Sequence, residues 1–581
     1  MLLCFEKGMF MKKLLPYLKP YKKQCLIGPL CKWIEALLEL ILPTIMAFMI
    51  DQGVLKQDRS IVFTYGILMI FMVFIGFCFS LICQYQASIA SQGFGTDMRN
   101  HLFERIMRFS FEDLDRFSPA TLLNRIGNDV NQVQLAVAML IRLAIRAPFI
   151  VIGSVFMAMI LDMELALILL AAIPLIVLTL YLYSRITTPY YQIYQEKFDR
   201  FLNILEQNLN GVRVIRAFLS QAVESKRLDE ASMDLQVQMT RISRISALLN
   251  PITALIINAT IILLLAAGIL SLPDAIPAGT LIAFINYATQ ILLALVATSN
   301  LIVIFSKASA SARRINELLA VEVMTTNAQA HEKTDAQHAL SCSHLQFTYP
   351  HAAHPSLIDI SFTIHKNETI GVIGGTGSGK STLAAVMMNF YPCAEMKLFG
   401  RSVAEYDATI LQRLITLIPQ KNELFSGTLK ENLLYGNPLA SEAEMWEALR
   451  QAQAEDFITV KGDGLALRIE AGGKNLSGGQ RQRLCIARGL LRQSDIIIFD
   501  DSFSALDFET DAKLRQALGE HHDMTKVIIS QRVATIWNSD RILVMDQGHI
   551  VGEGTHQELF DSCVVYREIC LSQNIAKEGI A

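Results

Sequence analysis

One glycine-rich stretch reads Gly374-Gly375-Thr376-Gly377-Ser378-Gly379-Lys380-Ser381-Thr382 and fits the phosphate-loop pattern G-x-x-x-x-G-K-[ST]. The apolar run before it, 369–374, predicts a short buried strand, and the run after it, 383–388, predicts the start of a helix. In that setting backbone N–H groups surround a phosphate, and the helix N-terminus adds positive dipole character. Lys380 is suited to reach the β- and γ-phosphates, and Ser381 to ligate Mg²⁺. The stretch therefore predicts a nucleotide site.

Composition places this site in an unusually apolar chain. The 581 residues are too many for one hydrophobic core, so we expect at least two domains. They are 52% hydrophobic and 18% charged, which is too apolar for a soluble protein of this size. The net charge of −3 gives no basic excess, so we expect no nucleic-acid partner. Ten cysteines lie scattered without a CxxC or Cys/His cluster, which indicates free thiols in a reducing compartment.

Apolar segments long enough to cross a bilayer, about 20 residues each, occur in the first half of the chain. The six segments lie near 25–50, 61–84, 138–160, 164–186, 246–271 and 278–305. Lys and Arg residues, Lys12 among them, gather before the first segment and in the loops 85–137 and 187–245, whereas the turns 161–164 and 271–274 hold none. This distribution predicts that both termini and both long loops are cytoplasmic. The N-terminal residues lack an apolar core with a small-residue cleavage site, so we expect no signal peptide.

Both long loops keep a helical spacing of apolar residues, as in the stretch 201–209. We therefore expect spans two to five to continue as helices beyond the membrane and to return through short tips. The candidate tips are Glu112–Leu123 and Val212–Lys226; two independent cytoplasmic hairpins are the alternative. The domain organisation expected from these patterns is a membrane domain over 1–315, a polar linker over 316–339 and an α/β nucleotide-binding domain over 340–581.

Several charged residues lie inside the expected spans: Lys32, Glu35, Glu39, Arg142 and Arg146. The first three share one helix face, and so do the two arginines. Ionisable residues at membrane depth usually face the bundle interior or a wet cavity. One interpretation is a polar lining of a substrate path. The other is an internal ion-pair cluster, or arginines whose heads reach the inner interface.

Further nucleotide-site candidates flank the phosphate loop. The apolar run 496–500 predicts a strand that ends in Asp500, a residue suited to the Mg²⁺ shell. Gln420 follows another predicted strand, and Tyr349 lies upstream, where its ring is suited to stack on adenine. Taken singly, Tyr349 also fits an ordinary core position and Gln420 an ordinary surface position. The run Leu476-Ser477-Gly478-Gly479-Gln480 opens a helix and adds a second anion-binding helix terminus.

The order of these motifs behind six spans resembles an ATP-binding cassette (ABC) exporter half-transporter. The resemblance covers nearly the whole chain, includes Ser504-Ala-Leu-Asp507, and extends to 115–129, which is similar to the first cytoplasmic loop of such exporters. It implies a six-span α-helical membrane bundle with long cytoplasmic helical extensions, followed by an α/β phosphate-loop ABC nucleotide-binding domain. It also implies ATP and Mg²⁺ as cofactors, and a dimer in which two cassettes meet head to tail.

The resemblance assigns roles residue by residue. Tyr349 would stack on adenine, residues 374–382 would hold the phosphates, Gln420 would sense the γ-phosphate and Mg²⁺, and Asp500 would support Mg²⁺. Leu476, Ser477, Gly478, Gly479 and Gln480 form the signature run, of which Ser477–Gln480 would cap ATP on the partner's phosphate loop, and Asp507 would lie in the loop at the dimer interface. The tips of the two long loops would act as coupling helices pressed on the cassettes.

Two positions depart from the family pattern. The general-base position after Asp500 holds Asp501, where the family has Glu. Asp is one methylene shorter, and misplacing a base by an ångström costs about 10²-fold. The switch position holds Gln531, where the family has His. Gln can hydrogen-bond a γ-phosphate but cannot carry a proton as His does. We expect this site to bind ATP and to hydrolyse it poorly.

The intact signature run would serve the opposite composite site, so the chain resembles one subunit of the heterodimeric bacterial exporters. The partner half-transporter would then supply a catalytic Glu and a switch His. The predicted function is ATP-driven export of a hydrophobic or amphipathic solute (a drug, lipid or peptide) across the bacterial plasma (inner) membrane, by a multi-pass protein in contact with membrane lipid. A homodimer with two slow sites and an ATP-gated, non-transporting regulator or channel are the alternatives. A soluble ATPase is excluded by the six spans.

Overall fold

The computed structural model describes residues 13–270, 277–321, 337–350, 352–520, 523–576 and 579–580. The chain divides into two compact units. The first comprises Met1–Met107 and Pro119–Val321, and the second comprises Arg108–Ser118 and Glu322–Ala581. The short segment Arg108–Ser118, expected to belong with the membrane domain, is therefore part of the cassette unit.

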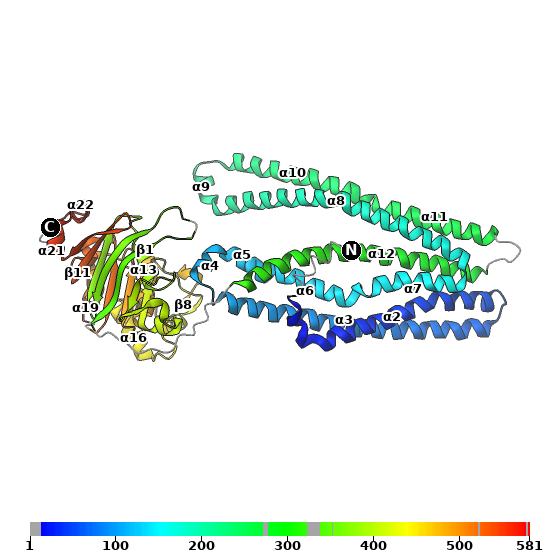
Figure 1. Ribbon diagram of the computed structural model, residues 1–581, viewed down its shortest axis with the longest axis horizontal. Coiled ribbons are helices and arrows are strands. Elements are labelled where there is room, and N and C mark those ends of the chain that lie inside the picture. The colour runs from blue at the N-terminus through cyan, green and yellow to red at the C-terminus, as the bar shows by residue number, and fades with distance from the viewer. Residues whose placement is uncertain are drawn as a thin grey trace. The chain divides into compact units, whose positions relative to one another are not determined.

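The first unit is entirely helical in its described part. Its elements, in chain order, are η1 (Leu15–Tyr21), α2 (Lys22–Phe48), η2 (Met49–Val54), α3 (Arg59–Ile106), α5 (Pro119–Asn124), η3 (Arg125–Asp129), α6 (Val130–Met139), η4 (Leu140–Ala144), α7 (Arg146–Leu161), α8 (Met163–Asn210), α9 (Val212–Ala217), α10 (Gln221–Ala247), α11 (Leu249–Leu270) and α12 (Ala278–Ala320). They form six helical stretches that are long and apolar enough to cross a membrane. Figure 1 shows α2 beside α3, and α8 beside α10 and α11.

The long helices confirm that the spans continue well past a bilayer. Helices α3 and α8 have 48 residues each, which at 1.5 Å per residue is about 72 Å, against a hydrocarbon core of about 30 Å. The alternative of separate cytoplasmic hairpins is therefore wrong. Helix α12 continues through Ala320, so it includes the first residues of the segment expected to be a linker. The rest of that linker (322–336), Lys12 and the turn 271–274 lie outside the described residues.

Small residues let the helices approach closely around α12. Ala36 of α2, Ala147 of α7 and Ala294 of α12 share one buried cluster, in keeping with the small interface residues that membrane helices use. The fully buried Tyr287 donates its hydroxyl to the Leu40 carbonyl oxygen at 2.9 Å, so its polar end is satisfied inside the bundle. These contacts join the first, third and sixth spans.

A buried ionic network ties η3 to the C-terminal part of α12. The Asp129 carboxylate is 1% exposed, and it accepts hydrogen bonds from Nε of Arg314 at 2.8 Å and from Oγ of Ser311 at 2.9 Å. A second hydrogen bond runs from an η-nitrogen of Arg314 to the same carboxylate, so the pair is bidentate. Arg125 donates to the Arg314 carbonyl oxygen at 2.8 Å and lies 3.2 Å from a carboxylate oxygen of Glu317.

The substitution Asp129→Asn is expected to lower the thermal stability of the chain. Removing the carboxylate leaves the Arg314 side of a buried network without its counter-charge, and because that guanidinium is 44% exposed we expect a loss of about 2 kcal/mol, below the usual 3–5 kcal/mol. The matched control is Asp234→Asn, since Asp234 faces Lys197 at 3.7 Å in a partly exposed pair worth about 0–1 kcal/mol. The measurement is the unfolding midpoint in lipid nanodiscs; equal midpoints for the two variants would contradict the network's role.

The cassette unit contains two main sheets. A six-stranded sheet has the order β12-β11-β3-β10-β9-β6, in which β11, β3, β10, β9 and β6 run parallel. A four-stranded antiparallel sheet has the order β2-β1-β4-β5. The strands are β1 (His338–Phe347), β2 (Leu357–His365), β3 (Thr369–Gly374), β4 (Met396–Leu398), β5 (Arg401–Ser402), β6 (Ile415–Ile418), β7 (Gly427–Thr428), β8 (Arg468–Ile469), β9 (Ile496–Asp500), β10 (Thr525–Ile529), β11 (Arg541–Asp546), β12 (His549–Gly554), β13 (Ile575–Ala576) and β14 (Gly579–Ile580).

Helices surround these strands. They are α4 (Phe111–Arg116), α13 (Lys380–Met387), η5 (Val403–Glu405), α14 (Ala408–Leu414), α15 (Leu429–Leu434), α16 (Glu442–Gln451), α17 (Glu455–Lys461), η6 (Gly464–Ala466), η7 (Ala471–Gly473), α18 (Gly478–Leu490), α19 (Phe508–Gly519), α20 (Val533–Ile536), α21 (His556–Ser562) and α22 (Val564–Ser572). Strands β3, β10 and β9 are adjacent and parallel, so the loops that follow them meet at one edge of the sheet. That edge holds the phosphate loop, Asp501 and Gln531.

Candidate functional site

A cleft of about 560 Å³ lies at this edge, a volume typical of ligand pockets. The predicted residues that line it are Thr376, Gly377, Ser378, Gly379, Lys380, Ser381, Thr382, Gln420, Asp500, Asp501 and Gln531. Ile529, at the end of β10, and two further segments, 354–356 and 547–548, complete the lining; no motif had pointed to the two segments. The structure thus brings together residues from segments more than 150 positions apart.

The phosphate loop needs its glycines for conformation and for space. Gly377 and Gly379 have φ of +82° and +99°, in the left-handed region that favours glycine. A Cβ on Gly374 would lie 2.2 Å from the Met545 carbonyl oxygen, so β11 passes too close for any side chain. Nζ of Lys380 donates to the carbonyl oxygens of Gly374 (2.9 Å) and Gly375 (2.7 Å), and burial lowers the pKa of this ammonium. The loop therefore closes around the ammonium group of Lys380.

Oxygen ligands suited to Mg²⁺ meet beside this loop. Oγ of Ser381 donates to a carboxylate oxygen of Asp500 at 3.1 Å, and Asp500 is 8% exposed. Gln420 adds an amide group from the end of β6. Within the described residues no group of three or more His, Cys, Asp or Glu side chains is placed to hold a metal ion alone. Mg²⁺ is usually bound by one or two carboxylates together with substrate phosphates and water, so the residues present fit it.

Asp501, at the general-base position, has a backbone conformation that few residues adopt. Its φ is +48°, which Asp tolerates better than most residues. Nε2 of Gln420 donates to its carboxylate at 3.4 Å, a long hydrogen bond. Burial raises the pKa of the Asp501 carboxyl, and the hydrogen bond from Gln420 and the charge of Lys380 partly offset that rise. Burial likewise raises the pKa of Asp500, which Ser381 partly offsets.

The switch segment is held by a residue that sequence reasoning missed. The Gln531 side chain is exposed and lines the cleft. The backbone carbonyl oxygen of Gln531 accepts a hydrogen bond from Nε2 of Gln573 at 2.8 Å, and the Gln573 side-chain oxygen accepts from the Val533 N–H at 2.9 Å. Gln573 therefore brackets the switch segment from the C-terminal region, 40 residues further along the chain.

The signature run opens α18 as expected. Ser477 is its N-cap: the hydroxyl accepts from the Gln480 N–H at 3.2 Å, and the Gln480 side chain accepts from the Ser477 N–H at 3.0 Å. The fully buried Gln482, a second missed residue, donates to the Asp501 carbonyl oxygen (3.4 Å) and accepts from the Ala505 N–H (3.0 Å). The signal for it was a polar residue on the buried face of an amphipathic helix. It links the signature helix to the base position.

Two other candidates have local contacts that explain their positions. Asp507 is the N-cap of α19 and accepts hydrogen bonds from the N–H of Thr510 at 3.1 Å and from its Oγ1 at 2.8 Å. These two hydrogen bonds lower the pKa of the Asp507 carboxyl. The Tyr349 hydroxyl donates to Oγ1 of Thr382 at 3.3 Å, which places the tyrosine directly beside the end of the phosphate loop. Its ring has edge-on contacts with Phe347 and Tyr391.

Four of the five charged positions named for the spans form ion pairs. Lys32 lies 2.7 Å from Glu35, and Arg146 lies 2.7 Å from Glu39. Arg142 donates to Oγ of Ser88 at 3.0 Å. These contacts favour the interpretation as an internal ion-pair cluster; a role in lining a substrate path stays a prediction.

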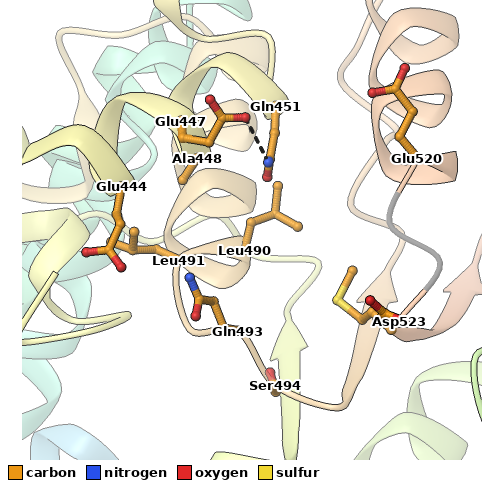
Figure 2. Close-up of a pocket in the computed structure, with 11 residues that line it drawn as sticks. Glu444, Glu447, Ala448, Gln451, Leu490, Leu491, Gln493, Ser494, Glu520 and Asp523 are labelled. Atoms are coloured by element: carbon orange, nitrogen blue, oxygen red, sulfur yellow. Dashed lines mark hydrogen bonds between the residues drawn. The ribbon is translucent and has the colours of Figure 1, made fainter. Parts of the chain in front are cut away.

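A second hollow of the cassette, about 360 Å³, is lined by side chains from α16, from the end of α18 and the residues after it, and by Glu520, Asp523 and Met524 (Figure 2). Its carboxylates include Glu444, which belongs to the capping box of α16, and Glu447, which pairs with Arg450 and accepts from Gln451. These two carboxylates therefore already have partners in α16 or at its N-cap.

Comparison with known proteins identifies the family of the chain. The model for the ABC transporter transmembrane region matches residues 25–295, and the model for the ABC transporter domain matches residues 357–504. An uncharacterized ABC transporter ATP-binding protein of Mycobacterium tuberculosis is 35% identical over 98% of this chain and 99% of its own length. The ATP-dependent lipid A-core flippase of Salmonella typhimurium is 29% identical over 96% and 97%.

The fold also matches a solved structure, that of a bacterial Atm1-family ABC exporter with ATP bound. The TM-score is 0.81 at 21% identity, over 96% of this chain and 99% of that one. The chain has six membrane-crossing helical stretches and one α/β cassette in a single polypeptide, and its similarity to relatives extends over nearly its whole length. It therefore belongs to the ABC transporter family, as a half-transporter of exporter type and an ATPase coupled to transport.

Proposed function

We propose that this half-transporter works as one subunit of a heterodimer, in which its own phosphate loop forms a site that binds ATP and hydrolyses it slowly. The observation that carries the proposal is that one cleft brings residues 376–382 of the phosphate loop together with Asp501 and Gln531. The short Asp501 side chain has a long hydrogen bond from Gln420, and Gln531 cannot carry a proton. The competent site would combine the partner's phosphate loop, Glu and His with the signature run of this chain.

In the site formed by the chain's own phosphate loop, each residue would have a separate role. Phosphates would lie on the N–H groups of 375–382, and Lys380 would exchange one of its carbonyl partners for a phosphate oxygen. Ser381, Asp500 and Gln420 would hold Mg²⁺, which neutralises phosphate charge when bound. Tyr349 would support the adenine ring. Asp501 would orient the attacking water from a position about one methylene too far away.

The tip of the second long loop exposes a surface suited to contact a partner cassette. Helix α9 and the residues after it expose large apolar side chains: Val214 is 61% exposed, Phe218 77% and Leu219 82%. Such a patch at a loop tip is typical of an interaction surface. We infer that it docks on the cassette of the second half-transporter, which assigns this predicted coupling helix to the partner.

The solute would be hydrophobic or amphipathic, moving outward as ATP binding closes the two cassettes. The name of the Salmonella relative, a lipid A-core flippase, supports a lipid among the candidates. The Lys and Arg distribution supports a plasma-membrane protein with its cassette in the cytoplasm.

The test is ATP hydrolysis by the purified chain, alone and mixed with the half-transporter encoded beside it in the genome. We expect little activity from the chain alone and strong activity from the mixture, lost when the catalytic Glu of the partner is replaced by Gln. Brisk turnover by this chain alone, abolished by Asp501→Asn, would instead establish a homodimer with two working sites.

A further inference from the structure

The short helix α4, at the tip of the first long loop, is built into the cassette unit. Phe111 at its start stacks on Phe390, with ring centroids 3.9 Å apart and planes inclined by 18°. Ser110 caps the helix by accepting from the Asp113 N–H at 3.1 Å. Along the chain this segment joins α3 to α5, so any shift of α4 is passed covalently to two membrane helices.

Tyr391, next to Phe390, contacts both α4 and the proposed adenine residue. It is 8% exposed, and its ring meets that of Tyr349 edge-on, with centroids 5.2 Å apart at 88°. Its hydroxyl donates a hydrogen bond to the Asp115 carboxylate of α4. Phe347 completes the cluster, 5.3 Å from Tyr391. The edge-to-face pair of Tyr349 and Tyr391 is attractive, so a change in the tilt of one ring alters the contact made by the other.

We propose that Tyr391 is a positioning residue that reports the presence of a nucleotide base at Tyr349 to the membrane helices through Asp115. This inference rests on the proposed role of Tyr349 in binding adenine. A purine stacked on Tyr349 fixes the angle of that ring, and the edge-on contact passes the constraint to Tyr391. Since the Tyr391 hydroxyl holds an otherwise exposed carboxylate, the position of α4 follows the tyrosine ring. Phosphate groups without a base would not change the angle of the Tyr349 ring, so they would not affect α4.

The experiment measures amide hydrogen exchange of the full-length chain in lipid nanodiscs, with MgATP or with Mg²⁺ and inorganic triphosphate. The amides of Leu114 and Phe117 report on α4, because they donate to Ser110 and Asp113 within the segment. The amides of 375–382 report on phosphate binding. We expect MgATP to slow exchange in α4 about tenfold, the effect of one hydrogen bond to a charged group. Triphosphate should protect the phosphate loop but not α4.

The variant Tyr391→Phe keeps the ring and removes the hydroxyl, so it should lose the slowing in α4 while MgATP still protects 375–382. Asp115→Asn, which keeps an oxygen acceptor without its charge, should retain a smaller slowing of about fivefold. The matched control is Tyr406→Phe, since the buried Tyr406 donates to the Leu398 carbonyl oxygen at 2.8 Å inside the cassette; it should behave as the unchanged chain.

Two outcomes would overturn the inference: slowing of α4 that persists in Tyr391→Phe, or equal slowing by triphosphate and MgATP in the unchanged chain. Failure of MgATP to protect 375–382 in the unchanged chain would instead contradict the proposed nucleotide site itself, and the inference with it. The two failures are distinguished by which segment stops responding.

Discussion

The double variant Asp501→Glu, Gln531→His is expected to hydrolyse ATP about 100-fold faster than the unchanged chain, because an ångström of displacement in a catalytic base costs about that factor. The added methylene moves the carboxylate toward the attacking water, and the imidazole adds a group that can carry a proton at the switch position. Both positions line the same cleft as the phosphate loop, so the change completes a site whose other parts are present. The measurement is phosphate release at saturating MgATP.

The conformation of Asp501 adds a cost that this experiment should detect. At φ of +48° an Asp is tolerated, whereas a Glu without local hydrogen bonding loses about 1 kcal/mol. We therefore expect the faster variant to have a slightly lower unfolding midpoint.

The pH dependence of ATP hydrolysis by the unchanged chain gives a second test of Asp501. Burial raises the pKa of its carboxyl, and only the ionised carboxylate accepts a proton. The residual rate of the unchanged chain should thus decline as pH falls through that raised pKa.

The matched control is Asp523→Glu, the same substitution at an exposed position of the second hollow, which should leave the rate unchanged. A double variant that is no faster than the unchanged chain would show that Asp501 and Gln531 do not limit turnover. In that case the slow step would have to lie elsewhere, and the account of this site as degenerate would be wrong.

Features that depend on local spacing or on length could be predicted from the sequence. The phosphate loop follows from glycines and a lysine within nine consecutive positions, because they must surround one phosphate group. The six-span bundle and its long helices follow from apolar length and an unbroken helical period. The capping box at Ser477 is likewise local, since it joins residues three apart.

Contacts between distant segments could not be predicted in this way. The hydrogen bonds of Gln573 to the switch segment depend on how the C-terminal helices fold back, and no periodicity encodes that. Arg146 pairs with Glu39, 107 positions away, although spacing alone suggested only shared helix faces. The same holds for Tyr391 and Asp115, 276 positions apart. The spans were predicted, but the choice of partner is a property of the tertiary fold.

The variant Ser477→Asp is expected to abolish nearly all ATP hydrolysis by the proposed heterodimer, with a loss of about 100-fold or more, since like charges brought together at an interface cost several kcal/mol. Asp is as good an N-cap as Ser, so α18 should remain formed. What changes is the charge at a helix terminus that would face the γ-phosphate of ATP on the partner's phosphate loop. The measurement is phosphate release by the mixture, and Ser441→Asp is the control, since Ser441 caps α16 with the same capping box at a remote position.

Comparing Ser477→Asp with Lys380→Ala tests whether the two ATP sites of the heterodimer are unequal. Lys380 belongs to the chain's own site, which is proposed to bind ATP without driving turnover, so its loss should weaken ATP binding there while most hydrolysis remains. Ser477 belongs to the opposite, competent site, so its change should stop hydrolysis while the chain's own phosphate loop still binds ATP. If both variants reduce the rate equally, the two sites contribute alike and the heterodimer with unequal sites is contradicted. If Ser477→Asp alone stops turnover, the signature run of this chain serves the site that hydrolyses ATP.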